Sequence, residues 1–136
     1  MVLLADVRDY LKTFNLFEGY GVGKIDASKK NILGVYPLRT GRHKTIGANT
    51  QKYDAKGVSL LIHGNTNATE TERLANRLYE ALNGAEGGSI AGKRVYIIEL
   101  QQDCPIDVGT AERGDTAGSD IYEFVIEVIF YIEREG

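Results

Sequence analysis

The feature that most constrains the fold is a run of alternating residues near the C-terminus, from Tyr122 to Ile132. Every second position there is large and apolar: Tyr122, Phe124, Ile126, Val128, Phe130 and Ile132. Because successive side chains of a strand point to opposite faces, this pattern predicts one long strand of about 40 Å at roughly 3.3 Å per residue.

The other face of this strand is mixed. Glu123, Glu127 and Glu133 interleave there with Val125, Ile129 and Tyr131. Soluble monomers seldom leave such an apolar stripe exposed. We therefore expect another surface to cover Val125, Ile129 and Tyr131.

Two amphipathic helices are also predicted. The first carries one apolar stripe with spacings of three and four, formed by Leu3, Leu4, Val7, Tyr10, Leu11 and Phe14. The second is predicted to begin at a capping box, Thr69 to Glu72, and to end at Gly84 as the residue after the C-cap. Its apolar face is formed by Thr71, Leu74, Ala75, Leu78 and Leu82.

Shorter strands are expected on both sides of a polar turn at 26–31, at Val58–His63, and at Lys93–Leu100 after a turn at 91–92. In the last of these, Val95, Ile97 and Glu99 alternate against Arg94, Tyr96, Ile98 and Leu100. This order favours a single α+β domain over 1–136: a mostly antiparallel sheet of about four to five strands with two helices packed on one face. Long loops are expected at about 39–56 and 102–119.

The composition excludes several classes of protein function. The chain has 136 residues and a net charge of -3, whereas a dedicated nucleic-acid binder normally carries a basic excess. One cysteine, Cys104, excludes an internal disulfide and fits a reducing compartment. The N-terminus lacks the basic flank of a signal peptide, and no apolar run reaches the roughly 20 residues of a membrane span. We expect a soluble domain folded inside a cell, with no membrane contact.

The segment 39–56 differs from the rest of the chain. It holds five Lys or Arg and one Asp, a local charge of +4, so the remainder carries -7. Its cations are Arg39, Arg42, Lys44, Lys52 and Lys56. Three interpretations stay open: a solvated mobile loop, a grip on nucleic-acid phosphates, and a basic arm that binds the acidic body of a neighbouring copy in a ring.

Catalytic and binding motifs are weak. His63 ends a buried strand, and Asp103, Asp107, Asp115 and Asp120 lie in or beside the second loop. A small ligand- or metal-binding domain or enzyme built around His63 and this 102–120 acidic loop is the alternative function, although the calcium-loop spacing is absent. The glycines from Gly19 to Gly23 are better explained as a flexible turn than as a phosphate cradle, because Lys24 occupies the third small-residue position. We expect no enzyme, cofactor or metal site.

Several segments resemble a known family. They are VSLLIHGNTNATETERLANRLYEAL, IAGKRVYIIEL, CPIDVGTAERGDTAG and IYEFVIEVIFYIER, and they cover about Val58 to Arg134. These segments are similar to minor capsid proteins of long-tailed bacteriophages, which look like tail terminators. The most specific pieces are the helix start at Thr69–Glu72, the segment Pro105–Gly109 and the segment Tyr122–Glu127.

The resemblance implies a structural protein of the virion, assembled in the host cytoplasm and located at the head–tail junction. Its partners would be its own copies in a hexameric ring, the tail-tube protein and the head connector. The ring would end tube polymerisation, and DNA would pass through its lumen without specific binding. On this basis, the expected assembly interface consists of Arg39, Arg42, Lys44, Lys52, Tyr53, Asp107, Asp115, Val125, Ile129 and Tyr131.

Overall fold

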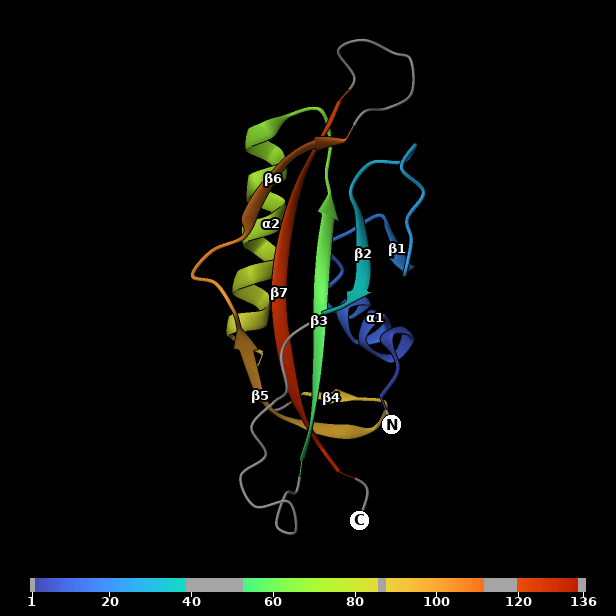
Figure 1. The fold of residues 1–136 in the computed structure, drawn as a ribbon, viewed down its shortest axis with the longest axis vertical. Helices are drawn as coiled ribbons and strands as arrows, with labels where there is room; N and C mark the ends of the chain where they lie inside the picture. The colour runs from blue at the N-terminus through green and yellow to red at the C-terminus, as the bar shows by residue number, and fades with distance from the viewer. Residues whose placement is uncertain (1, 39–52, 86–87, 112–119, 135–136) are drawn as a thin grey trace.

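The computed structural model describes residues 2–38, 53–85, 88–111 and 120–134. Two helices, α1 (Leu4–Lys12) and α2 (Ala68–Asn83), pack against one sheet (Figure 1). In chain order the strands are β1 (Gly19–Val22), β2 (Ile32–Pro37), β3 (Tyr53–His63), β4 (Ser89–Ile90), β5 (Lys93–Leu100), β6 (Ile106–Ala111) and β7 (Ile121–Glu133).

Strand β7 is the centre of the sheet, and the predicted long strand is confirmed at 13 residues. Along one edge β7 pairs antiparallel with β3, from Glu133 opposite Tyr53 to Glu123 opposite His63. Along its other edge it pairs antiparallel first with β5 and then with β6. Strands β2 and β1 follow beyond β3, and β4 pairs with β5.

The prediction of about four to five mostly antiparallel strands is wrong. The sheet has seven strands and is mixed, because β1 and β2 run parallel. The two strands beyond the predicted five are β4, which has only two residues, and β6, which an aspartate and a glycine interrupt, so neither shows an extended period-two pattern. The positions 53–56 and 106–111, which the sequence analysis assigns to loops, are strand.

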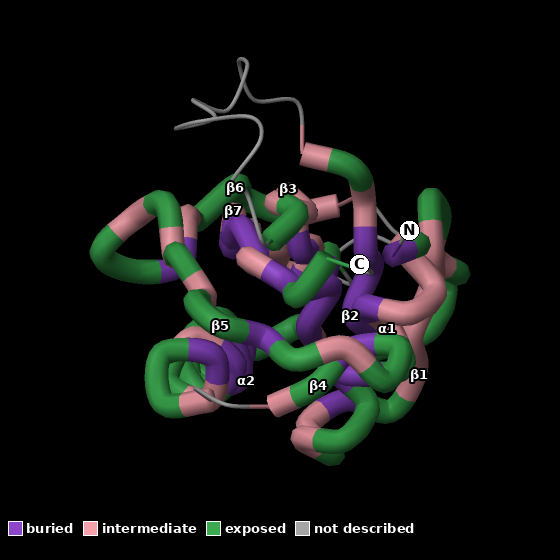
Figure 2. Tube along the Cα trace, turned by 90° about the horizontal axis from the view of Figure 1, so that it is seen from below, coloured by how far each residue is buried: buried purple, intermediate pink, exposed green. Residues whose placement is uncertain are grey.

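The core lies between the helices and one face of the sheet. The even-numbered residues of β7 face it and meet β3 side chains across the ladder, with Ile126 opposite Leu60 and Val128 opposite Val58. Phe130 is fully buried, and its ring meets that of Tyr10 edge-on at 5.9 Å between centroids. Figure 2 shows the buried positions gathered between α1, α2 and strands β2 and β7.

Helix α1 explains the curl of the sheet. It contacts β1 and β2 on one side and β4 on the other, although β1 and β4 lie at opposite ends of the strand order. Helix α2 covers β7, β3 and β5. The sheet therefore wraps partly around α1 as a half-barrel. We call the sheet surface turned away from α1 and α2 the outer face.

The ends of α2 differ from their prediction. Asn67, rather than Thr69, is the N-cap, and its side chain accepts a hydrogen bond from the Glu70 amide at 3.0 Å. Gly84 is the C-cap with φ -101°, so the helix ends without a left-handed residue at that position. Asn is as good an N-cap as Thr, and here it follows the turn that leaves β3.

A β-bulge in β5 changes which of its residues face the core. The register shifts between Val95 and Ile97, which places Val95, Ile98 and Leu100 on the helix side. Ile97 and Glu99 instead reach the outer face, opposite Tyr131 and Ile129 of β7. The predicted grouping of Val95 with Ile97 and Glu99 is therefore wrong, because one extra residue reverses the alternation.

The core packing generates a stability prediction. Phe130→Ala should lower the free energy of unfolding by about 3–5 kcal/mol, because it leaves a cavity beneath α1. Ile97→Ala is the control, because this side chain is 56% exposed, and it should change the free energy of unfolding by less than about 0.5 kcal/mol. Urea unfolding followed by circular dichroism measures both; equal losses would contradict this assignment of the core.

Candidate assembly interface

The outer face carries the apolar stripe that the sequence analysis singles out. Val125 of β7 lies between Leu61 of β3 and Ile106 of β6 in the strand register. Further along β7, Tyr131 lies between Ala55 of β3 and Ile97 of β5. Apolar side chains of three strands therefore meet on this face at two places.

Ile129, between these two places, is only 4% exposed. Its neighbour on β3 is Gly57, and Leu38 lies over that glycine, 3.4 Å from where a Cβ atom would be. Ile129 is thus already covered by its own chain and offers little area to a partner. Val125 and Tyr131 remain partly exposed.

Tyr53, Ile97 and Tyr131 form a cluster at one end of the outer face, which we call the tyrosine cluster. The rings of Tyr53 and Tyr131 meet edge-on, with centroids 5.5 Å apart and planes at 81°. Tyr53 is 37% exposed and Ile97 is 56% exposed. Exposed aromatic and aliphatic groups gathered in this way are typical of the centre of protein interfaces.

A hydrogen bond fixes the orientation of Tyr131. Its hydroxyl donates to Oε2 of Glu99 at 3.0 Å. Burial raises the pKa of the Tyr131 phenol, and the hydrogen bond and negative charge of Glu99 raise that pKa further. The phenol is therefore held neutral, as a donor, within the tyrosine cluster.

Of the other predicted interface residues that the structure describes, Asp107 is not part of this cluster. Asp107 lies on β6, next to Ile106, which pairs with Val125 of β7. Val125 is six residues from Tyr131, so about 20 Å separates these two positions along the strand at roughly 3.3 Å per residue. Asp107 is exposed, and its side chain accepts a hydrogen bond from the Gly109 amide at 2.8 Å. Five further predicted residues lie outside the described residues: Arg39, Arg42, Lys44, Lys52 and Asp115.

Both ring nitrogens of His63 contact polar groups of other segments. It is 1% exposed, with Nδ1 2.7 Å from Oε2 of Glu123 and Nε2 3.1 Å from the carbonyl oxygen of Ala27. A carbonyl can only accept, so the Nε2–H donates to Ala27, and Nδ1 lies within hydrogen-bonding distance of the Glu123 carboxylate. His63 thereby fastens the 23–31 segment to β3 and β7.

The metal-site alternative gains no support from the described residues. Among these residues, no group of three or more His, Cys, Asp and Glu side chains could hold a metal ion. His43, the other histidine, lies outside them. Neither of the two helices within the described ranges is long and apolar enough to cross a membrane.

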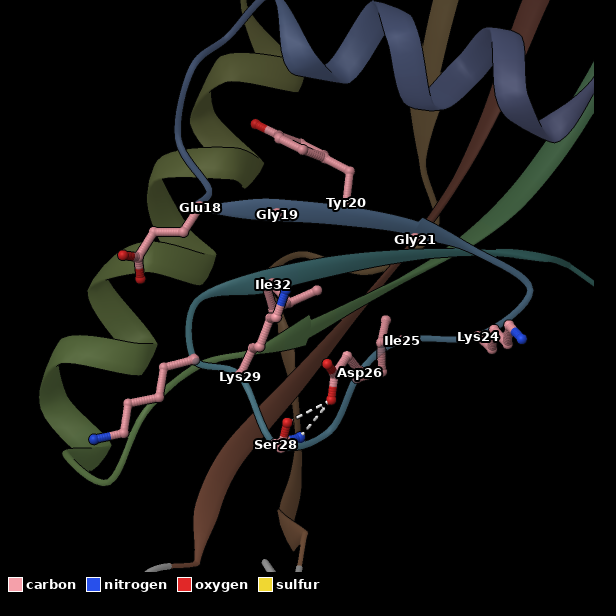
Figure 3. A pocket seen from close by; sticks show the side chains of 11 residues that line it. Glu18, Gly19, Tyr20, Gly21, Lys24, Ile25, Asp26, Ser28, Lys29 and Ile32 are labelled. Carbon is pink, nitrogen blue, oxygen red and sulfur yellow. Dashed lines mark hydrogen bonds between the residues drawn. The ribbon is translucent and has the colours of Figure 1, made fainter.

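A hollow of about 790 Å³ beside β1 was not foreseen from the sequence. In Figure 3, β1 passes along one side, the Lys24–Lys29 segment passes along the other, and Tyr20 points away toward α1. The predicted flexible turn at Gly19–Gly23 is largely strand β1. Its glycines, with Gly34 of β2, let the segment approach: a Cβ atom on Gly34 would lie 2.8 Å from Cγ2 of Ile25. The sequence signal for this hollow is weak: Gly19 and Gly21 two residues apart, and Gly34, which pairs with Gly21 only once β1 and β2 lie side by side.

Comparisons with known proteins identify one family. The sequence profile of the family described as "Bacteriophage tail terminator protein" matches residues 10–133. No curated protein matches the chain significantly. One solved structure, "Structure of bacteriophage SPP1 gp17 protein", is similar with a TM-score of 0.47 and 11% sequence identity, and the match covers 98% of this chain and 87% of that chain.

The contact between Tyr131 and Glu99 generates a titration prediction. Glu99→Gln should bring the pKa of Tyr131 down toward the ordinary tyrosine value, since it removes a negative acceptor. A raised phenol pKa stabilises the fold below the unfolded pKa of about 10, and this stabilisation is lost as the pH rises through the folded pKa. ¹³C NMR of labelled tyrosine ζ-carbons measures the change. The control, Glu72→Gln on α2, should leave the Tyr131 curve in place.

The His63 contacts generate a second prediction. His63→Phe leaves Glu123 and the Ala27 carbonyl without their donor, and should lower the free energy of unfolding by about 1–3 kcal/mol. Amide hydrogen exchange in 23–31 should speed up at the same time. Unchanged exchange in this segment would show that His63 does not fasten it.

Proposed function

Because the chain belongs to the bacteriophage tail terminator family, we propose that it forms a ring that caps the tail tube, ends tube polymerisation and joins the tail to the head connector. The single observation that best supports ring formation is the tyrosine cluster, an exposed apolar group on the outer face. An exposed cluster of this kind is expected to be covered by another protein.

The partners in this proposal are further copies of the chain, tail-tube protein and a head-completion or connector protein. The ring is taken to be a hexamer, and the protein is located in the virion at the head–tail junction. Its role is structural rather than catalytic. The net charge of -3 fits a lumen through which DNA passes without adhering.

Ring formation places two demands on the surface of the protomer. A closed ring larger than a dimer needs two different patches that fit each other, because a self-complementary patch gives only a pair. The interface must also exclude water from a few large side chains. Tyr53, Ile97 and Tyr131 meet the second demand, since rigid aromatic rings lose little conformational entropy when they are covered.

This proposal is tested by a charge placed in the tyrosine cluster. Ile97→Glu should require about tenfold more protein, or more, to cap tail tubes, because a carboxylate would be buried without a partner. The matched control is Leu3→Glu, since Leu3 is 54% exposed beside α1 and Ile97 is 56% exposed on β5. Electron microscopy of tube lengths with each variant provides the measurement. If Ile97→Glu caps tubes as well as Leu3→Glu does, the cluster is not part of the assembly surface.

A further inference from the structure

The hollow beside β1 has a composition that suits an acidic partner. Its base is apolar, formed by Ile25 and Ile32 beneath the glycines of β1. Around it lie three exposed lysines, Lys24, Lys29 and Lys30. Figure 3 shows Lys24 at one end and Lys29 between the loop and Ile32. We call this site the basic hollow.

The acids near the basic hollow are already engaged. Asp26 accepts hydrogen bonds from the Ser28 hydroxyl at 2.6 Å and the Ser28 amide at 3.1 Å, and these bonds hold the pKa of Asp26 below its ordinary value. Glu18 accepts a hydrogen bond from the Asn31 amide group at 2.9 Å. Within the described part of the chain, the three lysines make no ion pair shorter than 4 Å. Both acids keep their charge, so the three lysines, Asp26 and Glu18 that line the hollow sum to a net charge of +1.

A second site, beside β6 on the far edge of β7, has the reverse charge. The turn after β5 and the start of β6 expose Asp103, Cys104, Asp107 and Val108, which we call the acidic ridge. The stretch 101–111 contains these two aspartates and no Lys, Arg or His, a net charge of -2. Val108, 50% exposed, adds an apolar side chain that β6 presents beside Asp107.

The two sites lie at different edges of the sheet. β1 ends the sheet on one side, while β6 lies on the far edge of β7. Figure 1 shows β1 and its loop on the right and β6 with the preceding turn on the left, both in the upper half of the molecule. A rotation about the long axis therefore brings the ridge of one copy toward the hollow of the next, as a head-to-tail ring requires.

We propose that the acidic ridge of one copy inserts into the basic hollow of the next copy, so that these two sites form a contact between neighbouring copies in the ring. This inference rests on the proposed ring function and specifies which surfaces of the protomer meet. Asp103 and Asp107 face Lys24, Lys29 and Lys30, and Val108 covers the apolar base of the hollow. Opposite charges on the two sites also accelerate association and disfavour ridge-to-ridge pairs.

Side chains, rather than a continuous sheet, make this contact. β1 has only four residues, and β6 is interrupted by a bulge between Asp107 and Gly109. Short and bulged edges are the features by which proteins prevent strand-to-strand pairing. The hollow, in contrast, offers volume for several side chains, so complementarity of shape and charge replaces backbone hydrogen bonds.

The single cysteine of the chain makes the contact directly testable. Cys104 lies exposed in the ridge, so Lys29→Cys places a second thiol in the hollow of the neighbouring copy. Mild oxidation of this variant bound to tail tubes should give a disulfide ladder beyond the dimer on a non-reducing gel. Asn76→Cys, on the exposed side of α2, is the control and should give no ladder beyond the dimer. Lys30→Cys serves as a second probe at the same site.

An amine-reactive cross-linker applied to the wild-type protein on tubes separates this inference from the proposed function. If it gives a ring-sized product while neither cysteine probe gives a ladder, the ring stands and the ridge-to-hollow contact is wrong. If it gives no product larger than a dimer, the ring itself fails, and the contact fails with it. A ladder from the probes together with the ring-sized product supports both.

Charge reversal supplies an independent measurement. Changing Lys24, Lys29 and Lys30 to Glu, or Asp103 and Asp107 to Lys, should each abolish the ring, because like charges then meet. The two variants mixed in equal amounts should regain it, since each ridge again meets a hollow of opposite charge. Failure of the mixture, with both variants folded by circular dichroism, would overturn the proposal, as would normal capping by either variant alone.

Discussion

The pairing of β7 on both of its edges is the constraint on which the rest of the structure depends. Its ladder with β3 runs from Glu133 to Glu123, and β5 and β6 share the opposite edge. A strand held along both edges cannot slip by one residue, since that would turn Phe130 and its even-numbered neighbours toward solvent. The same register assigns the odd-numbered residues to the outer face. One ladder thus decides both the core and the surface available for assembly.

The proposed assembly features arise where the ladder is irregular. The bulge in β5 turns Ile97 to the outer face, beside Tyr131, and leaves it 56% exposed. The bulge in β6 leaves Val108 without a residue opposite it on β7. A regular strand would direct these side chains toward the core or pair them with a neighbour. Bulges are common where a protein needs to redirect a side chain, and here they supply apolar groups without weakening the core.

The sequence predicts the elements whose patterns are long and regular. The alternation around Phe130 and the helical spacing around Leu78 each have one explanation, and β7 and both helices are found where expected. β6 could not be predicted, because glycine and aspartate acquire strand geometry only from the neighbours that pair with them. The β5 bulge could not be detected in the sequence, because Tyr96, Ile97 and Ile98 are all large and mainly apolar, so no polar residue marks where the alternation reverses. Tyr53 and Tyr131, both predicted as interface residues, do contact each other. The basic hollow was not predicted, because it forms only when the 23–31 loop folds back onto the glycines of β1 and β2.

A ring closes only if the angle between its two joining surfaces is the same in every copy, because an angular error accumulates around the ring. In this protomer, β7 connects all the surfaces involved. Glu123 holds the hollow's loop through His63, Val125 pairs with Ile106 next to the acidic ridge, and Tyr131 belongs to the tyrosine cluster. Since β7 is paired on both edges, these three points cannot move independently. The buried ladder that stabilises the single molecule is therefore also what would set the geometry of the assembly.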